Sequence, residues 1–185
     1  MQRGLLEKLK LILAFIGFLW LVFLADVVFP VHFASFGLRP RTAAGLIGIA
    51  TMPFLHGGLH HIISNTIPLC VLLFLLAGSQ GRSARIIVGL ITLSGFLLWL
   101  TGRAGATHVG ASGLVYGLIT FLIVAGIRER RFLSLAVSAL TGFLFGGTFF
   151  LGILPTVGEN VSWEGHLTGA FAGIIIAMCI EGRST

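Results

Sequence analysis

The stretch 110–127, GASGLVYGLITFLIVAGI, carries a serine near its start and no charged side chain before Arg128. An α-helix needs roughly 20 apolar residues to cross the roughly 30 Å hydrocarbon core of a bilayer, so this stretch predicts a short membrane-spanning helix. Similar stretches predict further spans, giving a set at about 11–29, 59–77, 85–102, 112–127, 132–153 and 166–180. We therefore expect an all-α membrane protein, a six-transmembrane-helix bundle with a short fourth helix.

The composition favours the same class. Hydrophobic residues make up 56% of the 185 residues, charged residues make up 10%, and the mean hydropathy is +1.04. A water-soluble fold of this size could not bury so much apolar surface, whereas a lipid bilayer solvates it. The first span lacks a small-residue cleavage pattern and five more spans follow, so it is interpreted as part of the fold. With no repeat or low-complexity tract, the chain is expected to form a single domain, 1–185.

The distribution of lysine and arginine predicts an orientation. With a cytoplasmic N-terminus, nine of the 12 basic residues fall on the inner side: Arg3, Lys8, Lys10, Arg82, Arg85, Arg128, Arg130, Arg131 and Arg183. The outer loops hold Arg39, Arg41 and Arg103. This positive-inside bias predicts that both termini lie in the cytoplasm. The glycine-rich form with short tails predicts a prokaryotic plasma (inner) membrane, with an organellar membrane as the alternative. The positive-inside bias also explains the net charge of +6 without a nucleic-acid partner, since no basic stripe with interleaved aromatic residues is present.

Polar residues open the three spans that share one direction. His61 and Asn65 lie one turn apart on the second span and therefore on one face of that helix. Ser112 begins the fourth span and His166 begins the sixth. Because these spans all run from outside to inside, the four side chains are expected at one level near the outer leaflet, in a water-containing cavity.

These residue types suit nucleophilic catalysis. A serine hydroxyl becomes a good nucleophile when an imidazole takes its proton, and Ser112 at a helix start has a free backbone N–H that can stabilise an oxyanion. Asn65 and His61 can supply further donors. Since no aspartate lies near His166 on the sixth span, a Ser112–His166 dyad is favoured over a triad. Two stripes of small residues, 113/117 and 165/169/173, would allow the fourth and sixth spans to approach closely.

The ordered set of motifs resembles the rhomboid family of intramembrane serine proteases, in its minimal six-span form. The matching pieces are His56-Gly57-Gly58 followed by His61-xxx-Asn65, then Gly110-Ala111-Ser112-Gly113 with Tyr116, then Gly165-His166-xx-Gly169. They stand in the family's order on the expected spans, and the resemblance covers nearly the whole chain.

The resemblance implies roles for individual residues. Ser112 would be the nucleophile and His166 the general base and acid. His61, Asn65 and the Ser112 N–H would form the oxyanion hole. Tyr116 would pack against the His166 ring, and Gly110 would let the backbone turn beside the nucleophile.

The resemblance also implies a substrate class and a route to the site. Substrates would be single-span transmembrane proteins, cut in or near the span, with the fifth span acting as a mobile wall and the segment before Gly165 as a cap. No cofactor is implied. One feature departs from many bacterial members, which carry a Trp-Arg pair in the first outer loop, where this chain has Arg39-Pro40-Arg41.

Other interpretations fit the sequence less well. His56, His60 and His61 resemble a metal cluster, but H-E-x-x-H is absent and no carboxylate lies nearby, so no metal site is expected. A catalytically inactive rhomboid-like, client-binding membrane protein is the main alternative function, although such a protein would lack Ser112 or His166. A transporter would show inverted repeats, which this sequence lacks. The sequence does not indicate an oligomeric state.

Overall fold

A computed structural model describes residues 2–29, 32–155 and 161–180. Over these residues the chain is helical, with a single isolated bridge between Leu38 and His108 in place of a sheet. The long helices are α1 (Gln2–Val28), α3 (Leu59–Ser79), α4 (Ser83–Thr101), α5 (Ser112–Glu129), α6 (Phe132–Gly152) and α7 (Trp163–Cys179). The expectation of an all-α membrane bundle is confirmed.

Each of the six expected spans corresponds to one of these helices. Five of them, α1, α3, α4, α5 and α6, are long and apolar enough to cross a bilayer. At 18 residues α5 is the shortest of the five, and α7 is shorter still at 17 residues.

Two helices begin earlier than the apolar pattern predicts, and each has a local cause. Helix α1 continues through its charged first turns, where Lys10 pairs with Glu7 at 3.0 Å and Lys8 donates to the Ala77 carbonyl at 2.5 Å. Helix α7 begins at Trp163 because the Ser162 hydroxyl accepts the Gly165 N–H at 3.1 Å, which is an N-cap. The charge or polarity of these residues excludes them from the spans that hydropathy predicts.

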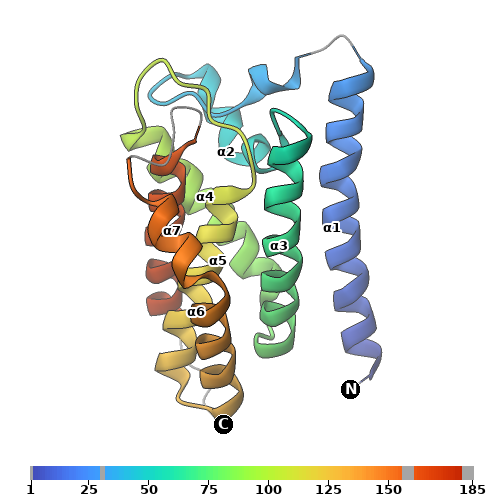
Figure 1. Ribbon diagram of the computed structural model, residues 1–185, viewed down its shortest axis with the longest axis vertical. Helices are drawn as coiled ribbons and strands as arrows, with labels where there is room; N and C mark the ends of the chain where they lie inside the picture. The colour runs from blue at the N-terminus through green and yellow to red at the C-terminus, as the bar shows by residue number, and fades with distance from the viewer. Residues whose placement is uncertain (1, 30–31, 156–160, 181–185) are drawn as a thin grey trace.

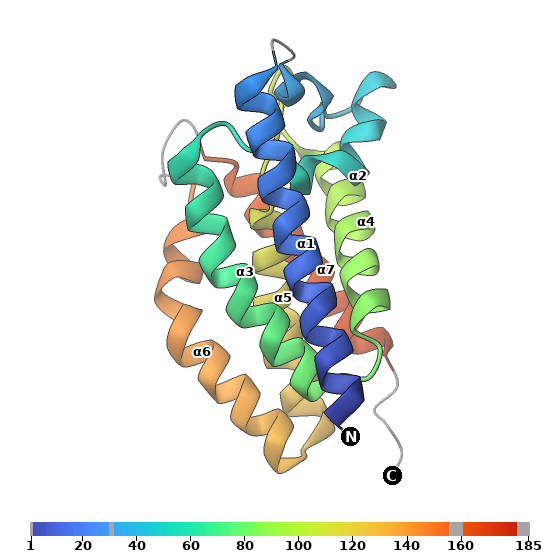
Figure 2. The same cartoon turned by 90° about the vertical axis from the view of Figure 1, so that its right-hand side faces the viewer.

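Helix α5 forms the centre of the bundle. Most of its residues are buried, whereas α1 and α6 are largely exposed. Figure 1 shows α5 surrounded by α3, α4, α6 and α7, with α1 standing at the edge beside α3. In the view turned by 90°, α6 and α4 lie along opposite edges (Figure 2). A helix that is apolar on most of its circumference is typical of the centre of a bundle.

Helices α5 and α7 meet at backbone distance through the predicted stripes of small residues. A Cβ placed on Gly113 would lie 3.3 Å from the Gly165 carbonyl oxygen, and one on Gly117 would lie 3.1 Å from that of Gly169. Added Cβ atoms on Gly169 and Gly173 would overlap the backbone of α5. Glycine is therefore required at positions 169 and 173, whereas an added methyl group at 113 or 117 would need its neighbours to shift by a few tenths of an ångström. Such close packing is typical of small-xxx-small helix pairs.

Helix α1 is attached to the rest of the bundle mainly through α3 and the segment before it. The Trp20 indole N–H donates to the Thr66 hydroxyl at 3.2 Å. Phe15 and Phe18 pack on Phe54 with ring centroids 5.5 and 5.2 Å apart. Few of its other side chains are buried, so most of α1 is available to lipid.

The long segment between α1 and α3 folds into short helical turns: η1 (Phe33–Phe36), η2 (Ala44–Ile47), α2 (Gly48–Thr51) and η3 (Met52–Phe54). Asp26 accepts the Phe33 N–H at 2.8 Å. Arg41 donates to the carbonyls of Leu100 and Gly102 at 3.0 and 2.8 Å. Arg41 thus ties this segment to the end of α4, and Asp26 ties the start of η1 to the end of α1.

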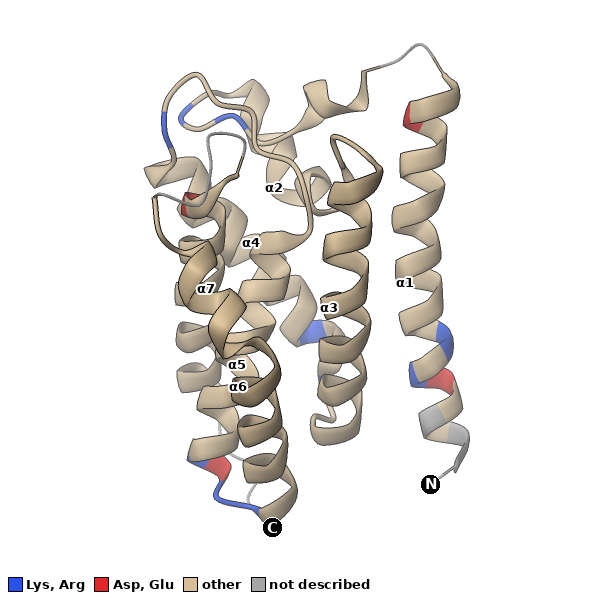
Figure 3. Cartoon of the chain, viewed as in Figure 1, with Lys and Arg blue, Asp and Glu red and all other residues tan. Residues whose placement is uncertain are grey.

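Most charged residues lie toward the two ends of the bundle, and a basic segment lies beside α3 at about mid-height (Figure 3). The end that carries α2, called the α2 end below, holds Arg39, Arg41 and Arg103, which contact Ser35, the end of α4 and Glu164, respectively. Arg128, Glu129 and Arg130 lie where α5 ends, at the opposite end of the bundle. Arg183, one of the expected inner basic residues, lies outside the described residues.

We predict that Gly169→Ala lowers the thermal unfolding midpoint in detergent, because its methyl group would overlap the Gly113 carbonyl. Overpacking of this kind destabilises by about 1–3 kcal/mol. The matched control is Gly142→Ala on α6, where an added Cβ meets no atom within 4 Å. The control should keep or raise the midpoint, since alanine favours the helix. Equal midpoints for Gly169→Ala and the wild type would contradict the prediction.

Candidate functional site

Ser112 is the first residue of α5, and its side chain is partly exposed. Its backbone N–H belongs to the first turn of the helix, where amide groups have no partner within the helix. The loop before it is held in place by the Gly110 N–H, which donates to the Met52 carbonyl at 2.9 Å. Ser112 therefore combines a hydroxyl, a free amide and the positive end of a helix dipole.

Gly110 brings the loop against α3. Its φ of +113° lies in the region that favours glycine. A Cβ at this position would lie 2.5 Å from His61 Nε2 and 3.6 Å from Asn65 Nδ2. Both the backbone conformation and the available space therefore require glycine, and His61 and Asn65 lie directly beside the loop that leads into Ser112.

Asn65 is buried, and its side-chain amide is oriented by its own helix. The Asn65 Nδ2 donates to the His61 carbonyl at 3.0 Å. An amide nitrogen carries two hydrogens, so the second N–H is free to bond an oxygen that develops negative charge next to Gly110.

His166 is buried and is fixed by two contacts from different helices. Its ring stacks on the Tyr116 ring with centroids 4.2 Å apart and planes 3° from parallel. Its Nδ1 lies 2.7 Å from the Gly152 carbonyl oxygen at the end of α6. Tyr116 is in turn held by its hydroxyl, which donates to the Thr148 carbonyl at 3.0 Å.

The Gly152 contact decides the tautomer of His166. A carbonyl oxygen can only accept, so His166 Nδ1 carries the hydrogen. In the neutral ring Nε2 then holds a lone pair and can take a proton. Gly152 and Thr148 act through their main-chain carbonyls, which leave no side-chain pattern, and sequence reasoning did not find them.

Ser112 and His166 lie on facing sides of the α5–α7 contact. Gly113, next to Ser112, and Gly165, next to His166, are the residues whose backbones meet. Among the residues that the structure describes, no hydrogen bond joins Ser112 Oγ to His166 Nε2. Catalytic hydrogen bonds often form only when substrate binds.

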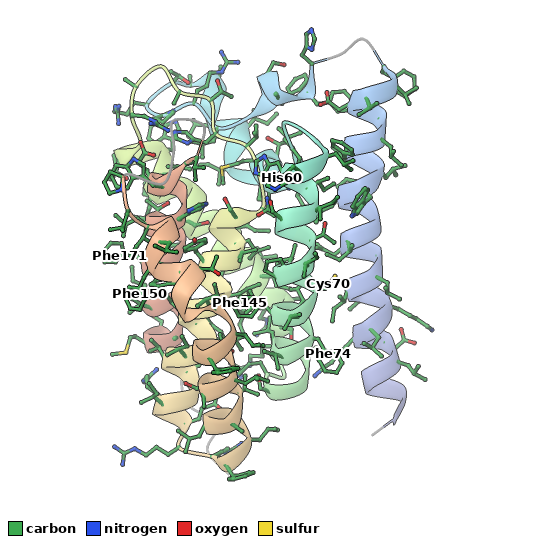
Figure 4. The ribbon with its side chains drawn as sticks, viewed as in Figure 1. His60, Cys70, Phe74, Phe145, Phe150 and Phe171 are labelled. Atoms are coloured by element: carbon green, nitrogen blue, oxygen red, sulfur yellow. The ribbon has the colours of Figure 1, made fainter. Side chains whose placement is uncertain are left out.

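His56 packs edge-on against the His61 ring, with ring centroids 5.1 Å apart. It is 4% exposed, and neither ring nitrogen has a hydrogen-bond partner within the described part of the chain. Burial lowers the pKa of His56 from 6.5 to about 4. His60 also lies toward the α2 end, at the start of α3 (Figure 4), but it is exposed. No three His, Cys, Asp or Glu side chains converge as metal ligands among the described residues.

The predicted site residues therefore gather at the α2 end of the bundle, where α3, α5, α6 and α7 meet. His61 and Asn65 face Gly110, while Tyr116 and His166 stack on each other, close to Ser112. Residues 156–160, which include part of the expected cap, lie outside the described residues.

Comparison with known proteins shows the family of this chain. Residues 43–183 match the family described as Rhomboid domain. The chain belongs to the rhomboid family. Similar proteins from Mycobacterium bovis and Mycobacterium tuberculosis, both described as uncharacterized, are 40% identical over 180 residues, covering 92% of this chain and 74% of theirs. One from Mycobacterium leprae, also described as uncharacterized, is 36% identical over 178 residues, covering 92% and 70%.

The matched residues contain every candidate site residue and all the rhomboid helices from α3 to α7. Helix α1 lies before the match, in agreement with its position at the edge of the bundle. Arg41 lies just before the match as well, and it fixes the first loop to α4 in a chain that lacks the Trp-Arg pair of many bacterial rhomboids.

We predict that acid destabilises this rhomboid partly through His56. Its pKa is about 4 in the folded protein, against 6.5 for an exposed histidine, so below pH 6.5 the unfolded chain binds a proton that the folded chain does not. Stability therefore falls as the pH falls from 6.5 toward 4. Thermal unfolding midpoints in detergent at about pH 7 and about pH 4.5 should differ less for His56→Phe than for the wild type. The same acid-induced drop in both proteins would contradict this.

Proposed function

We propose that this rhomboid is an intramembrane serine endopeptidase that hydrolyses peptide bonds in or near the transmembrane segments of single-span membrane proteins. The observation that carries the proposal is the fixed His166 ring. Stacking on Tyr116 and the Gly152 hydrogen bond leave Nε2 as the free basic nitrogen, one helix turn into α7 and beside the start of α5. A basic imidazole next to a helix-terminal serine is the minimum arrangement for acyl transfer.

In the first step Ser112 Oγ attacks the scissile carbonyl while His166 Nε2 takes the hydroxyl proton. The imidazolium that forms is stabilised by the Gly152 carbonyl, which accepts from Nδ1. This carbonyl is among the last of α6, so it lies at the negative end of that helix dipole. The main-chain acceptor thereby performs the orienting role that a carboxylate performs in a triad.

The tetrahedral intermediate carries an oxyanion that needs donors. The Ser112 N–H, the free N–H of Asn65 and the ring of His61 flank the Gly110 turn, and together they would form the oxyanion hole. As the intermediate collapses, His166 gives its proton to the leaving amine and an acyl-enzyme remains. Water, deprotonated by the same Nε2, then attacks the ester and releases Ser112.

The apolar helices and the charge asymmetry of the sequence support a membrane setting for this reaction. We place the α2 end at the outer side and both termini in the cytoplasm of a plasma (inner) membrane, since the basic residues favour the opposite end. Ser112 would then lie near the outer leaflet, where water can reach it. Helix α6 would form the wall through which a substrate helix approaches, since few of its side chains are buried.

We predict that Ser112→Ala and His166→Ala each abolish labelling of the purified protein by a fluorophosphonate probe, as well as cleavage of a membrane-anchored single-span substrate. Each variant removes one half of the proton-transfer pair, so neither should retain turnover. Ser79→Ala, at the opposite end of α3, and His60→Ala serve as controls and should label like the wild type. A folded wild type that neither labels nor cleaves would favour the inactive, client-binding alternative.

We predict that Asn65→Ala lowers kcat by about 10-fold to 1000-fold with little change in KM, because the lost donor acts on the oxyanion and not on the bound substrate. Thr66→Ala, the next residue on α3, is the matched control. It removes the hydrogen bond to Trp20 and leaves the site intact. An unchanged kcat in Asn65→Ala would exclude Asn65 from the oxyanion hole.

A further inference from the structure

Four polar side chains outside the catalytic pair connect the loop before Ser112 to the first turn of α7. Arg103 and His108 belong to that loop, and Ser162 and Glu164 belong to the start of α7. None of them is part of the rhomboid motifs from which the dyad was predicted. We call these four residues the loop–helix clamp.

Three side-chain interactions hold the clamp together. A hydrogen bond of 2.7 Å joins His108 Nδ1 to Ser162 Oγ. Arg103 Nε lies 3.2 Å from Glu164 Oε1, and Arg103 Nη2 donates to the Val161 carbonyl at 3.3 Å. The segment at the start of α7 is therefore bound to the loop at three closely spaced points.

Two of the four clamp residues, His108 and Glu164, are buried, whereas Ser162 is partly exposed and the Arg103 side chain is 46% exposed. His108 is 3% exposed and Glu164 is 8% exposed. His108 Nε2 and Glu164 Oε2 have no hydrogen-bond partner within the described residues. Buried polar groups that lack partners are costly, and an ion pair with a buried carboxylate adds little net stability. The clamp is thus poorly explained as a device for stability.

The position of the clamp relative to Ser112 and His166 indicates a role in placing these two residues. His108 lies four residues before Ser112 in the sequence. Its carbonyl accepts the Leu38 N–H at 3.0 Å, and its N–H donates to the Leu38 carbonyl at 2.8 Å. Ser162 lies as many residues before His166, and its carbonyl accepts the His166 N–H at 3.1 Å. The short bond between His108 and Ser162 therefore joins equivalent points on the two segments that carry the catalytic pair.

We propose that Arg103, His108, Ser162 and Glu164 are positioning residues that set the spacing between Ser112 and His166. This inference rests on the proposed protease function. It assigns the four residues no contact with substrate, so their loss should slow the chemical step and leave substrate binding unchanged. Misplacement of a catalytic group by about 1 Å is enough to cost on the order of 100-fold in rate.

The test compares His108→Asn with His108→Gln. An asparagine amide can take the place of the imidazole Nδ1 and keep the bond to Ser162, whereas a glutamine amide extends toward the place of Nε2. We expect His108→Gln and Arg103→Met to lower kcat and the fluorophosphonate labelling rate on the order of 100-fold, with KM within about twofold of the wild type. His108→Asn should recover most of the rate. Arg39→Met, which changes an exposed arginine of the first loop, is the control and should match the wild type.

Several outcomes would overturn the proposal. Labelling by His108→Gln and Arg103→Met at the wild-type rate would do so, as would equal rates for His108→Asn and His108→Gln. A rate that falls only in proportion to the folded fraction, measured by thermal unfolding, would show a purely structural role.

A readout independent of activity separates the clamp from the proposed function. Trp163 lies between Ser162 and Glu164, and in a Trp20→Phe, Trp99→Phe background it is the sole tryptophan. Loss of the clamp should free the first turn of α7 and increase acrylamide quenching of Trp163. If the wild type shows no labelling, the proposed function fails, and unchanged Trp163 quenching in the clamp variants would then overturn the clamp as well.

Discussion

The backbone contact between α5 and α7 is the constraint on which the rest of the bundle depends. It requires hydrogen in place of a side chain at Gly169 and Gly173 of α7, which lie against the backbone of α5 at Gly113 and Gly117. Thr120 adds a hydrogen bond of 2.8 Å to the Ala170 carbonyl across the same contact. Since lipid offers no hydrophobic drive for helix pairing, close packing of this kind replaces it. It also brings the residue after Ser112 against the residue before His166.

The candidate dyad is held in place by main-chain carbonyl groups, which no side-chain pattern in the sequence reveals. Gly152 and Thr148 supply carbonyls from the last turns of α6, one to His166 and one to Tyr116. The histidine thus depends on α7 for its position, on α5 for its stacking partner and on α6 for its tautomer. A glycine at position 152 is also needed for space, because a Cβ there would overlap the Tyr116 hydroxyl.

Much of the fold could be predicted from the sequence, because hydropathy and glycine spacing are patterns within single helices and need no knowledge of distant contacts. The spans and the small-residue stripes follow from such local patterns, and the packing of Tyr116 on His166 follows from the resemblance to rhomboids. The Gly152 acceptor, the Arg41 link to α4 and the Arg103–Glu164 pair could not be predicted. Each joins residues far apart in the chain through backbone carbonyls or a single ion pair. Hydropathy also places the start of α7 too late, because Glu164 has the polarity of a loop residue, whereas it is a buried acid in the first turn of that helix.

The hydrogen-bond acceptor of His166 is a main-chain carbonyl, and this limits which mutations can remove it. A carboxylate that orients a histidine disappears with one codon change, but every amino acid contributes a carbonyl oxygen, so no substitution at position 152 deletes the acceptor itself. The acceptor can be lost only if the end of α6 is displaced, for instance by a side chain that pushes against Tyr116. The hydrogen bond to His166 is therefore retained as long as the end of α6 keeps its position. Substitutions at position 152 would act on this bond only by changing how α6 packs.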